Sequence, residues 1–284
     1  MQLPKFIISY LRLLLSAPWR FNIYFMSTLK GVSHHFITRG IKKKYRWRNL
    51  LWLLLSANHL NNGYLIIDET DVDKSYAKII EGLGWIFSHR KNKSIFGYHL
   101  VVLAWTNGEI TIPITWRVYK KGGTTKPDIG YELIRFAYYQ LGIRPKAYLF
   151  DSLYASAKIL KFLNSRNQIF HTQVPKNRIL DDKQLKYHNK GRPRWKEIGR
   201  IKGGLEVQVI KNLKKYFITN DIGILRKEQL STYSIRWRIE EIFRFIKSEL
   251  GFEKCECRSL RSQNNHFGLC FVLFGILQVI SKKT

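Results

Sequence analysis

Four side chains that suit phosphate chemistry recur at helical spacing near the C-terminal end of the sequence. The stretch YSIRWRIEEIFRFIK, residues 233–247, places a phenol, two cations and a carboxylate on one stripe of a helix, beside an apolar stripe that would pack on a core. The four residues are Tyr233, Arg236, Glu240 and Lys247. Such a stripe suits the binding of a phosphate beside a metal ion. A solvated helix face with an ion pair would give a similar pattern.

The complete pattern Y-x2-R-x3-E-x6-K resembles the signature around the catalytic glutamate of DDE transposases in the insertion sequence four family. These are the cut-and-paste enzymes of bacterial mobile elements. The resemblance implies an α/β fold with a ribonuclease H-like catalytic core, a mixed central sheet flanked by helices. It also implies two catalytic aspartates upstream, at the ends of strands.

Two short apolar runs in the sequence end in an aspartate. Tyr64–Ile67 is followed by Asp68, and Ala147–Phe150 is followed by Asp151. A short strand without polar alternation is typical of the centre of a sheet, and its end is a rigid position for a ligand. A turn aspartate after a strand, or an N-cap of the next helix, would give the same pattern.

The segment around the first aspartate differs from the family at one position. Asp68-Glu69-Thr70 resembles the family's Asp-Asp-Thr, with Glu69 in second place. Asp71 and Asp73 are alternative ligands nearby, but only Asp68 directly follows the apolar run.

Carboxylates that converge from different elements can hold two divalent ions about 4 Å apart, one at the attacking oxygen and one at the leaving oxygen of phosphoryl transfer. We therefore predict that Asp68, Asp151 and Glu240 are the catalytic residues and metal ligands. Oxygen ligands favour Mg²⁺, and Mn²⁺ should substitute for it.

The other residues of the helix have two interpretations each. Glu241 lies about 100° round the helix from Glu240, and we expect it in solvent or in an ion pair. Arg236 and Lys247 are predicted to bind DNA phosphate near the cleaved bond, although charge balance alone would also explain them. Tyr233 could contact the same phosphate or only pack.

The charge of the chain indicates a polyanionic partner. Lysine and arginine total 49 against 20 acidic residues, which gives a net charge of +29, and the first acidic residue is Asp68. Double-stranded DNA explains this excess better than an anionic membrane, since no amphipathic lipid-facing segment stands out.

A basic and aromatic segment, Ile41–Asn49, suits contact with phosphates and bases. A solvated linker between two core helices is the alternative. The DNA contacts predicted here are Lys42, Lys43, Lys44, Arg46 and Arg48.

The chain divides into a helical, basic, DNA-binding region at residues 1–62 and a catalytic domain at 63–284. A β-rich basic insertion is expected at about 175–219, where Trp195 could stack on a distorted DNA base or pack internally. Further predicted elements are helical runs at Phe6–Leu15, Phe21–Leu29 and Leu50–Leu60, a hairpin turn at Thr106–Gly108, helices at Pro127–Leu141 and Tyr154–Ser165, a strand at Ile169–Val174, and helices at Lys227–Leu250 and Asn264–Ile280.

The three cysteines are sparse and odd in number, which favours a reducing, cytoplasmic compartment, with the protein at the nucleoid when bound to DNA. The spacing of Cys255, Cys257, His266 and Cys270 matches no standard zinc site, so we expect helix packing there. His99, in a strand-like run, is expected to pack or hydrogen bond.

Together these features predict a transposase that uses two Mg²⁺ ions to cleave DNA at transposon ends and to join the 3′ end to target DNA. The resemblance further implies a DNA hairpin intermediate and a homodimer in the synaptic complex. A nuclease of the same fold that cuts without joining, and an inactive DNA-binding relic, are the alternatives.

Overall fold

The computed structural model describes residues 3–16, 27–28, 31–47, 51 and 62–281. The predicted DNA contact Arg48 lies outside these ranges. Of the apolar runs Phe21–Leu29 and Leu50–Leu60, only residues 27, 28 and 51 lie within them. The first apolar run is helical as predicted, in α1 (Lys5–Ser16).

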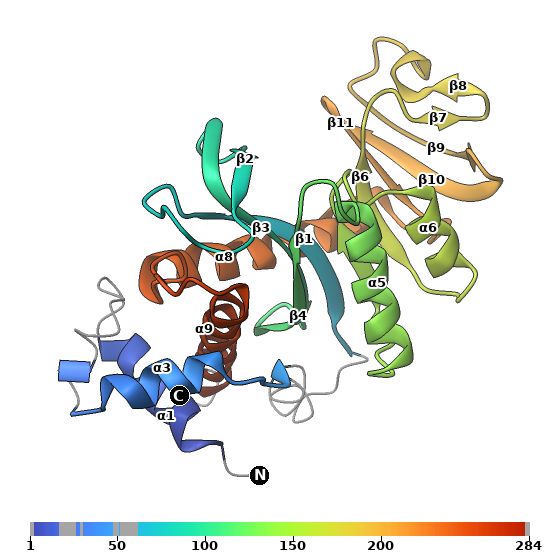
Figure 1. Ribbon diagram of the computed structural model, residues 1–284. Coiled ribbons are helices and arrows are strands. Elements are labelled where there is room, and N and C mark those ends of the chain that lie inside the picture. Colours follow the sequence, from blue (N-terminus) through green and yellow to red (C-terminus); the bar gives the residue numbers. More distant parts are fainter. Residues whose placement is uncertain (1–2, 17–26, 29–30, 48–50, 52–61, 282–284) are drawn as a thin grey trace.

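One mixed sheet of eleven strands organises the molecule (Figure 1). The strands of its catalytic half are β1 (Tyr64–Asp73), β2 (Gly84–Ser88), β3 (Lys93–Thr106), β4 (Thr111–Tyr119), β5 (Ala147–Phe150) and β6 (Phe170–Val174). β5 runs parallel to both β1 and β6, whereas β3 pairs antiparallel with β1, β2 and β4. The predicted hairpin turn joins β3 to β4, and β1 and β5 are central strands as their apolar runs predict.

Helices cover both faces of this half. Ile67 of β1 packs in a core with α5 (Lys126–Tyr139) and α6 (Ala157–Asn164). Ile66 packs in a second core with α8 (Arg238–Glu249) and α9 (Leu260–Ser281). β1 is therefore buried on both sides, because its successive side chains alternate between two helical layers.

By length and composition α9 could cross a membrane. In this fold it contacts α1, α8, β4 and α3 (His34–Lys42), and 61% of its apolar window is buried. These contacts are those of the central helix of a globular core. The N-terminal helices thus share one hydrophobic core with α8 and α9.

The insertion continues the same sheet. Its strands are β7 (Ile179–Leu180), β8 (Lys183–Gln184), β9 (Arg194–Ile201), β10 (Leu205–Asn212) and β11 (Lys215–Thr219). β11 pairs antiparallel with β6, so the predicted β-rich insertion is joined edge to edge with the catalytic half (Figure 1).

Trp195 belongs to the core of this insertion. It is 7% exposed, and its ring lies 6.2 Å from that of His188 and 6.0 Å from that of Tyr216. Because the indole is enclosed by its own strands, the structure supports the packing role and not the predicted stacking on a DNA base.

The helix predicted at Lys227–Leu250 is broken. α7 (Arg226–Ser234) and α8 are separated by a 3₁₀ turn, Ile235–Trp237. The residues on either side of the break make different tertiary contacts. Tyr233, at the end of α7, packs on Phe217 of the insertion, and Arg236, in the 3₁₀ turn, hydrogen bonds to Asp68 of β1. A 3₁₀ turn changes the winding between them, which the apolar periodicity alone does not reveal.

Candidate active site

Asp68 and Asp151 lie side by side at the sheet centre. The last parallel pair between β1 and β5 joins Ile67 to Phe150, and each aspartate is the next residue of its chain. Neighbouring strands are about 4.8 Å apart, so the two carboxyl groups start from adjacent positions. β1 continues to Asp73 beside β3, which makes Asp68 a residue inside a long strand and not its end.

The loop after β5 fixes Asp151. Its Oδ1 accepts a hydrogen bond from the backbone N–H of Leu153 at 3.0 Å, and its carbonyl oxygen accepts one from Thr172 Oγ1 at 3.2 Å. The N-cap of α6 is Ser156, so Asp151 does not cap this helix.

Glu240 reaches the aspartates through an arginine. It lies in the first turn of α8, and its Oε1 accepts a hydrogen bond from Arg236 Nη2 at 2.6 Å. Arg236 Nη1 donates to Oδ2 of Asp68. One guanidinium therefore lies between a carboxylate of the sheet and a carboxylate of the helix.

Burial and like charge act together on these carboxyl groups. Burial and, to a smaller extent, the nearby Asp151 carboxylate raise the pKa of Asp68 to about 7 against the opposing effect of Arg236. Burial also raises the pKa of Asp151. The centre holds more negative charge than its one arginine balances, so it should attract a further cation.

A divalent ion fits the donor set but not the side-chain positions as they stand. In the ranges that the structure describes, no three His, Cys, Asp or Glu side chains form a group ready to hold a metal ion. At the triad, the Arg236 guanidinium occupies the space between Asp68 and Glu240 as a stand-in cation. Partly buried oxygen donors of like charge suit a hard divalent ion that replaces it.

Lys247 lies apart from the triad. Its Nζ is 2.8 Å from Oδ1 of Asp71 and 3.6 Å from Oε1 of Glu253, and its side chain is 7% exposed. The structure thus shows Lys247 in the charge-balancing role, and its contact with DNA phosphate stays a prediction.

Tyr233 adjoins the triad arginine. Its ring lies 4.9 Å from the ring of Phe217, and the Arg236 guanidinium lies 5.9 Å from its centre. Burial raises the pKa of Tyr233 to about 12, so the phenol stays protonated and can donate a hydrogen bond. Both of its predicted roles remain open. Glu241 pairs with Arg238 at 2.9 Å, as expected.

Sequence reasoning missed a second cation close to the triad. Lys126, at the first position of α5, pairs with Glu69 at 2.8 Å, and its charge lowers the pKa of Asp151. The charge of Glu69, where the sequence departs from the family's Asp-Asp-Thr, is therefore neutralised by Lys126 at the start of α5. The signal for this contact in the sequence is a lysine directly before Pro127, which opens the helix.

The cysteine and histidine cluster is a packing site. Cys255, Cys270 and His266 are buried. His266 Nδ1 accepts from the Tyr10 hydroxyl at 3.0 Å, and its Nε2 donates to the Gly251 carbonyl at 3.1 Å. Burial lowers the pKa of His266 to about 3, so its ring is neutral. His99 is also buried, as expected.

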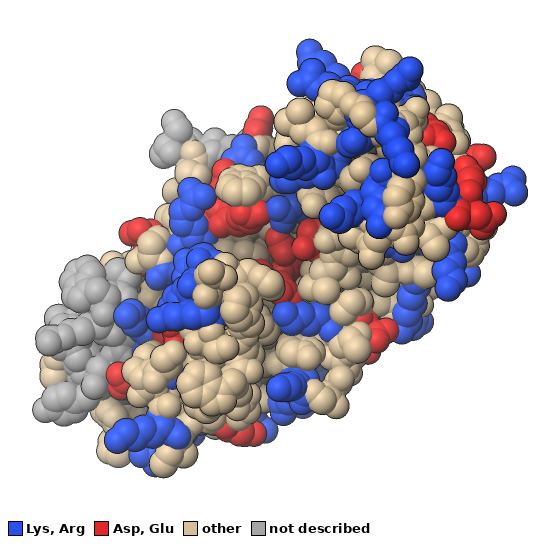
Figure 2. Space-filling model, turned by 90° about the horizontal axis from the view of Figure 1, so that it is seen from above, with Lys and Arg blue, Asp and Glu red and all other residues tan. Residues whose placement is uncertain are grey.

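Basic side chains surround the acidic centre. Seen from above, acidic side chains gather in a hollow between two lobes that carry many lysines and arginines (Figure 2). The insertion, residues 175–219, contributes thirteen basic against four acidic residues. A polyanion could bind to the basic lobes on either side of the hollow and react at the acidic residues within it.

Comparisons with known proteins identify the family and the fold. Residues 62–274 match the family described as the transposase DDE domain. The fold is similar to that of the piggyBac transposase in a synaptic complex with hairpin DNA, with a TM-score of 0.60 at 12% identity, over 100% of this chain and 68% of that one.

More distant structures belong to the Mos1 transposase. The chain in the Mos1 strand transfer complex gives a TM-score of 0.25 at 16% identity, over 62% of this chain and 59% of that one, which is too low to compare the folds. A search of curated proteins found no match.

Proposed function

Because the chain belongs to the family with the transposase DDE domain, we propose that it cuts DNA at the ends of a mobile element and joins the freed 3′ end to target DNA. The single observation that carries this proposal is that Asp68 and Glu240 share one guanidinium, with the Asp151 carboxyl group close to Asp68. A ribonuclease H-like core is supported by the parallel β1, β5 and β6, and by the aspartates beyond the last β1–β5 pair. The complete Y-x2-R-x3-E-x6-K pattern supports membership of the insertion sequence four group.

Asp68, Asp151 and Glu240 would hold the metal. DDE transposases generally use divalent ions, and two Mg²⁺ ions, or Mn²⁺ in their place, would supply charge at the attacking and leaving oxygens of the phosphodiester. Asp68 would give up its proton as the site takes up positive charge, since a nearby cation lowers the pKa that burial and the Asp151 carboxylate raise.

Arg236 would then change partners. Its guanidinium leaves Asp68 and Glu240 and donates its forked N–H groups to a phosphate oxygen of the DNA, a geometry that suits a bidentate contact. The Tyr233 hydroxyl beside it, protonated at neutral pH, can donate to the same phosphate. Thr172 and Leu153 keep Asp151 in place during this exchange.

The partner would be double-stranded DNA, held by the insertion and by Lys42, Lys43, Lys44 and Arg46. The piggyBac neighbour was solved as a synaptic complex with hairpin DNA. A homodimer that pairs two transposon ends, with a hairpin intermediate, is the corresponding proposal for this chain. The free cysteines support a cytoplasmic location.

The test is cleavage of a labelled duplex that carries the element's own ends, with Mg²⁺, by the wild type and by Glu240→Gln. We expect cleavage by the wild type, loss of cleavage in the variant, and equal DNA binding by both. Binding without cleavage by the wild type, in Mg²⁺ and in Mn²⁺, would leave only the inactive relic. Cleavage without joining to target DNA would identify a nuclease.

A further inference from the structure

A large cavity lies on the other side of β3 from the triad. Its volume is about 1320 Å³, and four consecutive residues of β4, 115–118, line it. A strand turns successive side chains to opposite faces, so consecutive residues border the same cavity only along the strand's edge. Among the described residues β4 pairs with β3 alone, and the cavity adjoins its other edge.

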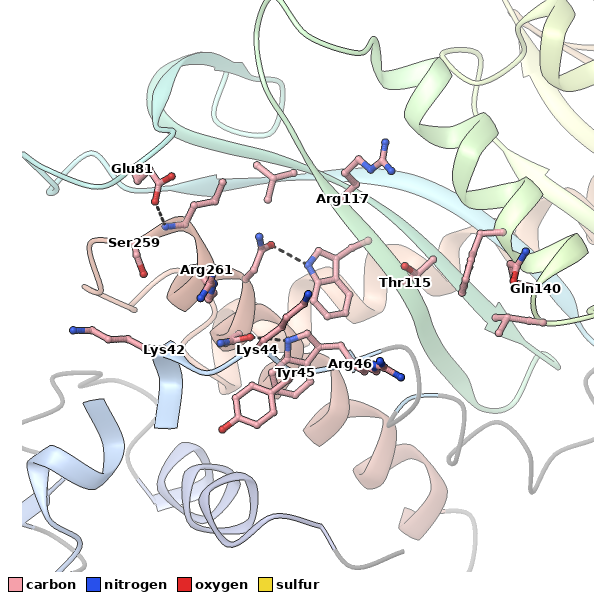
Figure 3. A pocket seen from close by; sticks show the side chains of 18 residues that line it. Lys42, Lys44, Tyr45, Arg46, Glu81, Thr115, Arg117, Gln140, Ser259 and Arg261 are labelled. Carbon is pink, nitrogen blue, oxygen red and sulfur yellow. Dashed lines mark hydrogen bonds between the residues drawn. The ribbon is translucent and has the colours of Figure 1, made fainter. Parts of the chain in front are cut away.

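The cavity is lined by cations from three separate parts of the chain (Figure 3). These are Lys42 at the end of α3, Lys44 and Arg46 after it, Arg117 of β4, which pairs with Glu132 of α5, and Arg261 of α9. Glu81 is the acidic residue among the described lining, and its carboxylate accepts a hydrogen bond from the backbone N–H of Leu260 at 2.9 Å. Apart from the exposed pair of Arg117 with Glu132, four cations stand against one acid, which favours a polyanionic ligand.

The basic segment is fixed to the core by one side chain. Asn265 of α9 donates from Nδ2 to the carbonyl oxygens of Ile41 at 2.6 Å and Lys43 at 2.8 Å. Its Oδ1 accepts from Trp47 Nε1 at 2.9 Å. The segment is thus held to α9 and is not a loose solvated linker, and Lys44 and Arg46 stay exposed beside it.

Strand register places the cavity close to the triad. Asp68 pairs with Val102 of β3, which pairs with Trp116 of β4, a lining residue. Two strand spacings put Trp116 about 10 Å from Asp68 across the sheet. Since duplex DNA rises about 3.4 Å per base pair along its axis, a duplex whose axis runs from the triad to the cavity has about three base pairs or more between them.

We propose that this cavity is a second DNA contact, which binds the phosphate backbone three or more base pairs from the cleaved bond. Arg117 and Arg261 of the catalytic core would act there together with the basic segment. The inference rests on the proposed function, because it takes the DNA at the triad as its reference point. An extended peptide could also add to the β4 edge, but it would not require five cations.

The experiment measures how the affinity for a labelled end duplex depends on salt concentration, by fluorescence anisotropy. Each phosphate contact contributes about one to the slope of log K against log salt, so Arg117→Gln/Arg261→Gln should lower the slope by about two. Lys5→Gln/Arg12→Gln, which removes two exposed cations of α1 outside the cavity, should leave it unchanged. Urea unfolding of each variant checks that the fold is kept.

Phosphate ethylation interference on the same duplex gives the location. In the wild type, ethylation three or more base pairs from the cleaved bond should weaken binding, and this interference should vanish in Arg117→Gln/Arg261→Gln. An unchanged slope in that variant, with normal wild-type binding, overturns the inference and leaves the proposed function standing. An equal loss in the α1 control also overturns it, because the effect would then be diffuse charge. If the wild type binds no DNA, both proposals fail.

Discussion

Two aspartates of β1, three residues apart, pair with cations of the same helical segment, and yet their pKa values shift in opposite directions. Asp68 pairs with Arg236, and burial raises its pKa to about 7. Asp71 pairs with Lys247, and burial again raises its pKa, but Lys247 and the Ser88 hydroxyl outweigh burial and lower it to about 2.

Burial raises the pKa of both aspartates, and the difference lies in how far neighbouring groups offset that effect. Asp68 shares one guanidinium with Glu240, and the Asp151 carboxylate lies close by. Asp71 has an ammonium, a hydroxyl and a further arginine nearby. A balanced pair stabilises the fold, whereas a cluster with excess negative charge retains an affinity for cations that a reaction can use.

The distinction between Asp68 and Asp71 is tested most strongly by neutralising each aspartate. Asp68→Asn should lower the single-turnover rate of DNA cleavage by about 10³-fold or more, because it removes a group that acts in the reaction. Asp71→Asn should lower it by less than about tenfold, since it keeps a polar partner for Ser88 and Lys247. Equal losses in the two folded variants would contradict the distinction.

Removing the paired cations, Lys247 and Arg236, should affect the free energy of unfolding in the reverse order. Lys247→Met leaves Asp71 as a buried charge without its ammonium, and should lower the free energy of unfolding by about 3–5 kcal/mol. Arg236→Met should cost less, under about 2 kcal/mol, because Asp68 takes up a proton instead. Urea unfolding measures both, with exposed Lys254→Met as the control. A larger loss for Arg236→Met would refute this order.

Much of this fold could be predicted from the sequence. The apolar runs before Asp68 and Asp151 are strong local signals, because a strand buried on both faces needs apolar residues throughout. The helical spacing around Glu240 likewise placed it on a stripe beside the apolar face that packs on the core.

The remaining features depend on contacts between distant residues. Whether Lys247 meets a phosphate or Asp71, and whether Trp195 meets a base or Tyr216, is decided by the packing of strands and helices. The 3₁₀ turn at Arg236 arises where a helix must satisfy the insertion and β1 at once. No local pattern in the sequence records these choices.

The pH dependence of stability separates the two aspartates by sign. The folded pKa of Asp68 lies above the unfolded value of about 4, so the folded protein binds the extra proton and its stability falls as pH rises from about 4 to 7. The folded pKa of Asp71 lies below that value, so its contribution is lost as pH falls from about 4 to 2.

Urea unfolding in metal-free buffer over this pH range tests both signs. Asp68→Asn should remove the change of stability with pH between about 4 and 7, and Asp71→Asn the change between about 2 and 4. A wild-type stability that rises between pH 4 and 7, and loses that rise in Asp68→Asn, would contradict the assignment.

Added Mg²⁺ should stabilise only the cluster with excess negative charge. An ion at tenfold its dissociation constant stabilises the folded state by about 1.4 kcal/mol. The increase in melting temperature should be lost in Asp68→Asn and kept in Asp71→Asn. Arg236→Met should reach the same increase at lower Mg²⁺, because the ion no longer displaces a guanidinium.

The smallest effect should come from the residue next to the catalytic glutamate. Glu241 forms an exposed pair with Arg238, with side chains 46% and 39% exposed, so Glu241→Gln should change the free energy of unfolding by less than about 0.5 kcal/mol. Cleavage should also be unchanged, because Glu241 lies about 100° round the helix from Glu240, the residue that shares Arg236 with Asp68. Normal cleavage by Glu240→Gln with loss in Glu241→Gln would exchange their roles. Since the two changes are chemically identical and one residue apart, any difference between them measures the position of the carboxylate alone.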